Sequence, residues 1–454
     1  MGKLLALLSG LFLLAACAGE EPPNALADAR GYEFPPPPSL SPADSSPRVE
    51  QAAEVLAASA TGELDLEALS VLSDSGDPRW AWLLSDFLRF FQLGRPALAL
   101  VEAFETLTGV DPTADPSFTD SPWRSITDHL LAWDLPPPPR YRELKASLFL
   151  LVEPKWEPFF TDADAATDWR LLSWGGVFID DRPPGDTGFC ERGCIPALDD
   201  PGLVEAEAGD WYPNANIVFG VVVGNEAVAF PKHIMEVHEM VNVTIGGRRL
   251  GIPYCTLCGS AQAFFTDELP QPVVLRTSGL LSRSNKVMFD LTTFSAFDTF
   301  QGTAWSGPLQ GMELAQTTVV SSSWGDWKDA HPLTRIVAQD GGIGRIYPED
   351  PLGGRDAAGP IFPVGPVDPR LPVQAQVVGV TTEEGPVAFP VDSIRPVIEV
   401  EGEIRWAGVV IVADGGGFRA VDEDGNQVPS HQAFWFAWSQ FNPGTAVWTP
   451  LPSS

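Results

Sequence analysis

Two cysteines at positions 255 and 258 carry the strongest chemical signal in the chain. Gly259 follows them, and glycine can adopt the positive φ that closes a tight turn. Such a turn points backbone N–H groups at two sulfurs, so it can hold two thiolates on one metal ion or bring two thiols together as a disulfide. A purely structural disulfide or a pair of buried free thiols gives the same spacing. Apolar runs at 243–254 and 261–265 place the pair at the tip or end of a strand pair.

The composition limits the partners and the redox state of this site. The chain has 454 residues, a formal net charge of −32 and a pI near 4.3, which argue against nucleic acid or an anionic membrane surface as a partner. Apart from Cys17 there are four cysteines, at 190, 194, 255 and 258. This even number allows two disulfides or one four-thiolate site, and composition does not choose between them.

The start of the chain has the pattern of a secretory leader. A positively charged residue precedes an apolar run at 4–14, which is too short for a spanning helix, and small residues precede Cys17. The pattern resembles a bacterial lipobox, so we expect residues 1–17 to be a lipoprotein signal peptide and the lipid on Cys17 to anchor the protein to a membrane. The expected location is the cell envelope, at the outer membrane of a Gram-negative cell because Ala18 follows the cysteine, with the soluble part periplasmic or extracellular.

The rest of the chain predicts an α+β protein. Residues 18–48 are rich in proline and form a stiff tether. Residues 49–173 repeat apolar side chains at three- and four-residue steps, which predicts a helical module. Short β-type runs separated by glycine and proline follow. We expect them to form a first β-rich unit over 174–340, which carries the cysteine pair, and a shorter, degenerate second unit over 341–454.

Two landmarks recur in the same order within the β-rich part. The Val-Ala-Phe-Pro segment at 228–231 recurs at 387–390, and the Trp-x-x-Trp segment at 324–327 recurs at 435–438. This recurrence predicts a β-rich core of two related, unequal units. The second copy has no cysteine. A fold can therefore be built from the pattern without thiols, and the cysteine pair is what the first copy adds.

Several motifs resemble one family closely. They are Trp-Gly-Gly-Val at 174–177, His-Glu-x-x-Asn at 238–242, Tyr-Cys-x-Leu-Cys-Gly at 254–259, and a Ser-Gly-Leu-Leu block at 278–281 that leads to Ser284 and Asn285. The motifs are similar to those of the bacterial and archaeal domain-of-unknown-function family 3179. Thr256 replaces the family's usual proline, which loosens the turn but keeps the spacing. The family has no established function, so the resemblance implies little about activity.

With this resemblance, Cys255 and Cys258 need a further partner to close a metal site. His238 is the best candidate, because imidazole and thiolate together suit zinc or copper. Glu239 beside it could orient that ligand through a hydrogen bond. Four polar residues of the motifs could line a pocket: Glu239, Asn242, Ser284 and Asn285.

The other two cysteines lie in a segment, near 181–194, that looks like an insertion into the family pattern. A site general to the family cannot require them, so we expect a local Cys190–Cys194 disulfide that is dispensable for the chemistry of Cys255 and Cys258. The rival interpretation is a zinc cage of four cysteines, in which the insertion folds across the first pair.

These inferences give one leading function and two alternatives. The leading one is a lipid-anchored envelope protein that binds a transition metal, zinc or copper, through Cys255, Cys258 and His238. The first alternative is a thiol–disulfide oxidoreductase that uses the same cysteine pair. The second is a structural scaffold with disulfides only. The chain has no Gly-x-Ser-x-Gly elbow and no phosphate-binding loop, so hydrolase and nucleotide-binding functions lack support.

Overall fold

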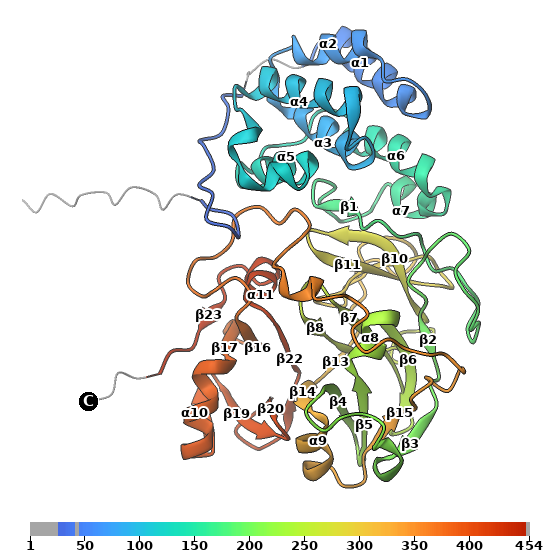
Figure 1. Ribbon diagram of the computed structural model, residues 1–454, viewed down its shortest axis with the longest axis vertical. Helices are drawn as coiled ribbons and strands as arrows, with labels where there is room; N and C mark the ends of the chain where they lie inside the picture. The colour runs from blue at the N-terminus through green and yellow to red at the C-terminus, as the bar shows by residue number, and fades with distance from the viewer. Residues whose placement is uncertain (1–25, 41–44, 451–454) are drawn as a thin grey trace, which may run out of the picture.

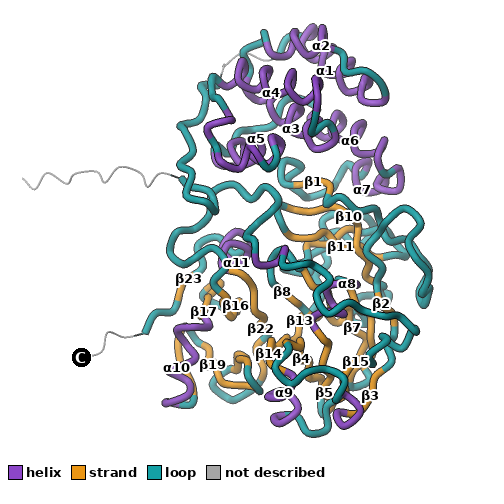
Figure 2. The backbone as a smooth tube through the Cα atoms, in the orientation of Figure 1, coloured by secondary structure: helices purple, strands orange, loops and turns teal. Residues whose placement is uncertain are grey.

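Most of the helices gather at one end of the molecule, and the strands make up the rest together with a few further helices (Figures 1 and 2). The computed structural model describes residues 26–40 and 45–450, so the predicted signal peptide, with Cys17, lies outside the described residues. The described chain is therefore mixed α+β, with most of its helices in the N-terminal part. None of the helices described combines the length and the apolarity that a membrane span requires.

The helical part is a run of α-helices joined by short turns and 3-10 segments. Side chains cap several of them: Ser46 accepts a hydrogen bond from the Val49 N–H, and Ser121 accepts one from the Arg124 N–H. The helices are α1 (Pro47–Ala58), α2 (Leu66–Ser73), α3 (Ala81–Phe90), α4 (Gly94–Thr108), α5 (Pro122–Ala132), α6 (Tyr141–Val152) and α7 (Glu157–Thr161).

The helical part packs directly on the first of the sheets. This sheet has the order β1-β10-β11-β12, with strands β1 (Leu172–Trp174), β10 (Leu275–Ser282), β11 (Asn285–Asp290) and β12 (Ala296–Asp298). Leu280 and Phe289 from the sheet share one apolar core with Phe87 of α3. The Trp156 indole donates a hydrogen bond to the Ser278 carbonyl at 2.7 Å. Helices and sheet thus form a single core, which fixes the β10–β11 hairpin.

The second sheet carries the cysteine pair. Its order is β13-β9-β7-β6-β2, and β8 pairs with β7 off this path. Its strands are β2 (Leu198–Asp199), β6 (Met240–Ile245), β7 (Arg248–Cys255), β8 (Ser260–Ala261), β9 (Ala263–Phe265) and β13 (Gln316–Thr317). The short helix α8 (Lys232–His238) leads into β6, and Glu239, which follows the helix with a φ of +50°, turns the chain into the strand.

Three further sheets complete the described part of the chain. The third, β14-β4-β5-β15-β3, has strands β3 (Leu203–Glu205), β4 (Ile217–Val223), β5 (Glu226–Pro231), β14 (Val319–Ser323) and β15 (Arg335–Val337). The fourth, β22-β16-β17-β23, has strands β16 (Gln376–Thr382), β17 (Gly385–Pro390), β22 (Ser430–Phe434) and β23 (Ala446–Val447). The fifth, β18-β19-β20-β21, has strands β18 (Glu403–Trp406), β19 (Val409–Asp414), β20 (Gly417–Val421) and β21 (Gln427–Val428). The helices among them are α9 (Trp324–Ala330), α10 (Val391–Glu401) and α11 (Trp435–Phe441).

The strands described therefore divide into five sheets, and not into the two related, unequal units that the recurrence predicts. The recurring landmarks mark only one sheet in each half, the third and the fourth. The first sheet pairs β1 with β10 and so joins segments about a hundred residues apart in the chain. No local sequence pattern predicts such a long-range pairing.

The recurrence still has a clear structural basis in the third and fourth sheets. Each has a parallel pair at one side, β5 with β15 and β17 with β23. Trp327 of α9 covers Gly220 so closely that an added Cβ would lie 2.3 Å from its ring, and its indole donates to the Thr334 hydroxyl at 2.9 Å. The counterparts in the fourth sheet are Gly379, Trp438 and Thr445, with the same 2.9 Å hydrogen bond. Glycine, tryptophan and threonine thus form one packing unit that appears twice.

Candidate functional site

The Cys255–Cys258 pair lies at a hairpin tip between β7 and β8, as the flanking apolar runs predict. Tyr254 pairs with Ala261 and Cys255 with Ser260, so both ends of the turn are held by the sheet. Gly259 closes the turn with a φ of +58°, a conformation that side-chain-bearing residues rarely adopt. Both thiols are free and buried. The turn therefore presents two reduced sulfurs inside the protein.

The β10–β11 hairpin of the first sheet supplies the polar contacts of these sulfurs. The Cys255 sulfur lies 3.6 Å from the Ser284 carbonyl oxygen. The Cys258 sulfur lies 3.5 Å from the Ser284 hydroxyl and 3.8 Å from the Asn285 side-chain oxygen. Two of the residues that the sequence analysis selects for a pocket, Ser284 and Asn285, are thus neighbours of the sulfurs.

A buried ion pair borders the same site. The Lys286 ammonium contacts the Glu239 carbonyl and lies 3.2 Å from the Glu239 carboxylate. The other carboxylate oxygen of Glu239 accepts a hydrogen bond from the Thr256 hydroxyl at 3.2 Å. Glu239 therefore links α8, the cysteine turn and β11. Sequence reasoning missed Lys286, although a lysine inside the apolar strand 285–290 is a signal of a buried partner.

The two thiols have different acidities. Burial raises the pKa of Cys255, but the hydrogen bond from Cys258, the Lys286 charge and the Lys286 backbone N–H lower it, and the net pKa falls below its usual range. Burial and the adjacent charge of Cys255 raise the pKa of Cys258 well above its usual range. Cys255 therefore ionises before Cys258, whose thiol contacts the Ser284 hydroxyl and the Asn285 side-chain oxygen.

A cavity of about 430 Å³ opens beside Cys255. Its polar lining includes Glu239, Lys286 and Arg355, and its apolar lining includes Leu280 and Phe362. Cys255 is part of the lining, whereas Cys258 is not. The more acidic thiol therefore lines the cavity and the less acidic one does not.

The fourth sheet covers the end of the cysteine turn, at Cys258 and Gly259. The Phe434 N–H donates to the Cys258 carbonyl at 2.8 Å. An added Cβ on Gly259 would lie 2.7 Å from the Phe434 ring. Cys255 and Cys258 belong to one apolar cluster with Trp435 of α11. The cysteine-free copy of the recurring sheet thus packs against the cysteine turn.

His238 does not join the two sulfurs in the structure, contrary to the expected ligand set. Its Nδ1 lies 2.7 Å from the Pro196 carbonyl and its Nε2 lies 2.7 Å from the Tyr347 hydroxyl, so both ring nitrogens have other partners. Burial lowers the pKa of His238 to about 4. Among the described residues, no third histidine, cysteine or carboxylate lies close enough to complete a cluster with Cys255 and Cys258.

Asn242 also lies away from the cavity. Its side-chain amide donates to Asp199 at 2.9 Å and to the Leu275 carbonyl at 3.0 Å, and its oxygen accepts from the Leu275 N–H at 3.2 Å. These bonds tie β6 to β2 and β10. Of the four residues selected for a pocket, Glu239 alone lines the cavity, Ser284 and Asn285 contact the sulfurs, and Asn242 is structural.

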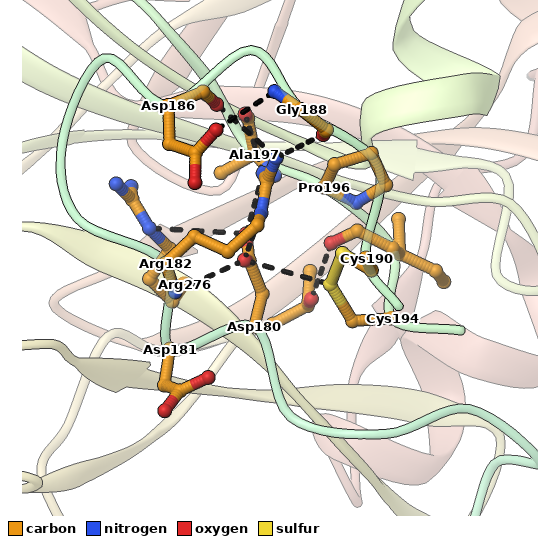
Figure 3. The surroundings of a disulfide bond; sticks show 12 residues. Asp180, Asp181, Arg182, Asp186, Gly188, Cys190, Cys194, Pro196, Ala197 and Arg276 are labelled. Atoms are coloured by element: carbon orange, nitrogen blue, oxygen red, sulfur yellow. Dashed lines mark hydrogen bonds and ion pairs between the residues drawn. A yellow bond between two sulfur atoms is a disulfide. The ribbon is translucent and has the colours of Figure 1, made fainter. Parts of the chain in front are cut away.

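Cys190 and Cys194 form the expected local disulfide, with their Cα atoms 5.3 Å apart. Figure 3 shows the bond beside Asp180, whose carboxylate lies 3.5 Å from the Cys194 sulfur. Ligand atoms of these three residues lie within 4.8 Å of one another, a spacing that is compatible with a metal ion. Asp180 is already paired with Arg182 at 2.6 Å, however, so its charge is neutralised.

Comparison with known proteins places the chain in one family. No curated protein and no solved structure matches it. The family described as "Protein of unknown function (DUF3179)" matches residues 192–445, more than half of the chain and the whole of the cysteine site. The chain therefore belongs to this family.

Proposed function

We propose that the protein is a thiol–disulfide oxidoreductase that acts on small disulfides, with Cys255 as the attacking thiolate and Cys258 as the resolving thiol. The observation that carries the proposal is the position of the pair: two free, buried thiols share one tight turn, and Cys255 lines the cavity whereas Cys258 does not. The direction of the pKa shifts, lower for Cys255 and higher for Cys258, supports the same assignment. A thiolate is the nucleophile in such exchange, and the second thiol must be near it to release the product.

The reaction balances with the groups present. The Cys255 thiolate attacks one sulfur of a bound disulfide, the substrate S–S bond breaks, and the first product thiol leaves with a proton. The Cys258 thiol then loses its proton and attacks the Cys255 sulfur, which releases the second thiol and leaves a Cys255–Cys258 disulfide. Two electrons pass from the cysteine pair to the substrate. One proton comes from Cys258, and the other comes from water, which took it when Cys255 ionised.

The burial of the site favours a small substrate. Cys255 is 2% exposed, so the surface of a folded protein cannot reach its sulfur. A small molecule that enters the cavity of about 430 Å³ can reach the Cys255 sulfur. The lining is mostly apolar, and its charged groups are of both signs, which suits a neutral organic disulfide with an apolar body. The charged groups are Lys286, Arg355, Glu236, Glu239 and Asp356.

Metal binding, the leading function from sequence, has weaker support. The Lys286 ammonium lies close enough to both sulfurs to lower the pKa of each thiol. Its positive charge would repel a metal ion bound to the same sulfurs. The imidazole expected to complete the site bonds elsewhere. Anchoring in the cell envelope through a lipid on Cys17 stays part of the proposal, on the basis of the sequence alone.

The test uses 4,4′-dithiodipyridine, a small neutral disulfide that releases a coloured thione. We expect the wild type to release two thiones per chain and Cys258→Ser to release one and keep a mixed disulfide on Cys255. Cys255→Ser should react at least tenfold more slowly, because the remaining thiol is less acidic and does not line the cavity. The double variant Cys190→Ser/Cys194→Ser is the matched control and should react like the wild type.

Two results would remove the proposal. One is equal reactivity of Cys255→Ser and Cys258→Ser. The other is a stoichiometric metal ion in the purified wild type that is absent from Cys255→Ser, which would restore the metal-binding function.

A further inference from the structure

A second cavity lies on the other side of α8, away from the thiols. It measures about 650 Å³ and is formed by the segment 211–216, the start of α8 and the segment 339–349 that follows β15. The segment after β15 runs beside α8 in Figure 1, and the hydrogen bond between Tyr347 and His238 fixes it there. The cavity shares no lining residue with the thiol site.

Four aromatic rings line this cavity. The Tyr212 and His233 rings are stacked with their centroids 5.2 Å apart, and the Trp211 ring lies 5.9 Å from His233. The Tyr347 ring meets His233 edge-on at 6.1 Å. The rings therefore form one continuous surface of the cavity. We call this surface the aromatic wall (Trp211, Tyr212, His233 and Tyr347).

The hydroxyl groups of the aromatic wall are bonded within the protein. The Tyr212 hydroxyl donates to the Ile217 carbonyl at 2.6 Å, and the Tyr347 hydroxyl lies 2.7 Å from His238 Nε2. Burial raises the pKa of Tyr347 to about 12, so its ring stays neutral. Burial lowers the pKa of His233, which favours a neutral imidazole. The aromatic wall is thus an uncharged surface, and hydrogen bonds within the protein hold its two tyrosines in place.

The rest of the lining is polar and of mixed charge. It contains the Arg345 guanidinium, the carboxylates of Asp340 and Glu349, and the amides of Asn216 and Gln339. Neither Arg345 nor Glu349 has an ion-pair partner among the residues that the structure describes. These groups can both donate and accept hydrogen bonds, and they bring one positive and two negative formal charges to the lining.

The charges decide which class of ligand fits. An anion would meet two carboxylates, whereas a quaternary ammonium ion would meet Arg345, which already lies 5.7 Å from the centroid of the Tyr347 ring. A neutral ring with hydroxyl groups avoids both conflicts. Its C–H face packs on aromatic rings, and its hydroxyls bond to carboxylates, amides and guanidinium groups. We propose that this cavity binds a neutral carbohydrate.

The test measures by calorimetry how three neutral trisaccharides bind to the purified protein. The three sugars are maltotriose, cellotriose and chitotriose. We expect saturable binding of at least one of them. Trp211→Ala should weaken it about tenfold, because it removes one stacking ring. Glu349→Gln should weaken binding several-fold, because Glu349 lines the cavity. Glu349 is exposed, so its substitution leaves the fold intact. This variant therefore tests the proposal even if Trp211→Ala does not fold.

Glu384→Gln, an exposed carboxylate in the turn between β16 and β17, is the matched control and should bind like the wild type. Cys255→Ser should also bind like the wild type, because the cavities share no lining residue. Absence of saturation with all three sugars would overturn the proposal. Binding that both cavity variants leave unchanged would also overturn it, as would saturable binding of choline or inorganic phosphate that Trp211→Ala abolishes.

Discussion

Replacing Lys286 tests the electrostatic basis of the thiol site. The Lys286 charge lowers the pKa of Cys255, and the Glu239 charge raises it. Lys286→Met removes the cation but also leaves a buried carboxylate unpaired, which costs about 3–5 kcal/mol of folding free energy. The double variant Lys286→Met/Glu239→Gln avoids this cost, and the single variant Glu239→Gln shifts the pKa of Cys255 in the opposite direction.

The size of the effect follows from the kind of interaction. A neighbouring opposite charge shifts a pKa by about one to three units. Each unit changes the thiolate fraction below the pKa about tenfold. We therefore expect Lys286→Met to raise the pKa of Cys255 by at least about one unit, and Glu239→Gln to lower it.

The assay is the rate of alkylation by iodoacetamide as a function of pH, read by intact mass. It uses a Cys258→Ser background, so that only one free thiol titrates and the serine hydroxyl can still donate a hydrogen bond to Cys255. The midpoint should rise with Lys286→Met and fall with Glu239→Gln. An unchanged midpoint in both variants would refute the assignment of Cys255 as the thiolate that Lys286 stabilises.

Three further predictions concern stability. Gly220→Ala should lower the free energy of unfolding by about 3 kcal/mol in chemical denaturation, because the new methyl group would overlap the Trp327 ring. Burial lowers the pKa of His431 to about 4, so its neutral form stabilises the fold above pH 6.5 and this contribution is lost as the pH falls towards 4. Relative to His431→Gln, the wild type should lose up to about 3 kcal/mol across that interval. Cys190→Ser/Cys194→Ser should lower stability by about 2 kcal/mol, as expected for a short loop.

Each stability prediction has its own control and its own contradicting result. The control for Gly220→Ala is Gly224→Ala, because a methyl group there meets no atom and the only cost is backbone strain of about 1 kcal/mol at a φ of +60°. If both variants lose the same free energy of unfolding, overlap with the Trp327 ring is not the cause of the loss in Gly220→Ala. Parallel pH curves for the wild type and His431→Gln would show that His431 titrates normally. An unchanged free energy of unfolding in Cys190→Ser/Cys194→Ser would contradict the third prediction, and the wild type measured with a reductant is its control.

The local parts of the site could be predicted from sequence because short-range rules set them. The Cys-x-x-Cys-Gly spacing predicts a turn at the end of a strand, and β7 and β8 flank that turn. The Cys190–Cys194 disulfide closes over a separation of four residues, so its two cysteines are close in sequence as well as in space. Such features depend on neighbouring residues only.

Long-range partners could not be predicted in the same way. His238 bonds to Pro196 and Tyr347, which lie 42 and 109 residues away in the chain, and nothing near His238 indicates that its nitrogens are occupied. Lys286 acquires its role through Glu239, 47 residues earlier. The division into two units failed for the same reason, since pairing between distant strands sets the sheets.

The most direct test of the central claim is the covalent state of the cysteines after one turnover. Reduced wild-type protein is exposed to a small organic disulfide, quenched with an alkylating agent and mapped by peptide mass spectrometry. The account predicts a Cys255–Cys258 disulfide, an unchanged Cys190–Cys194 bond, and full reversal by a small dithiol. Cys255 and Cys258 that stay reduced and unmodified in the native protein, while they react once it is unfolded, would contradict it.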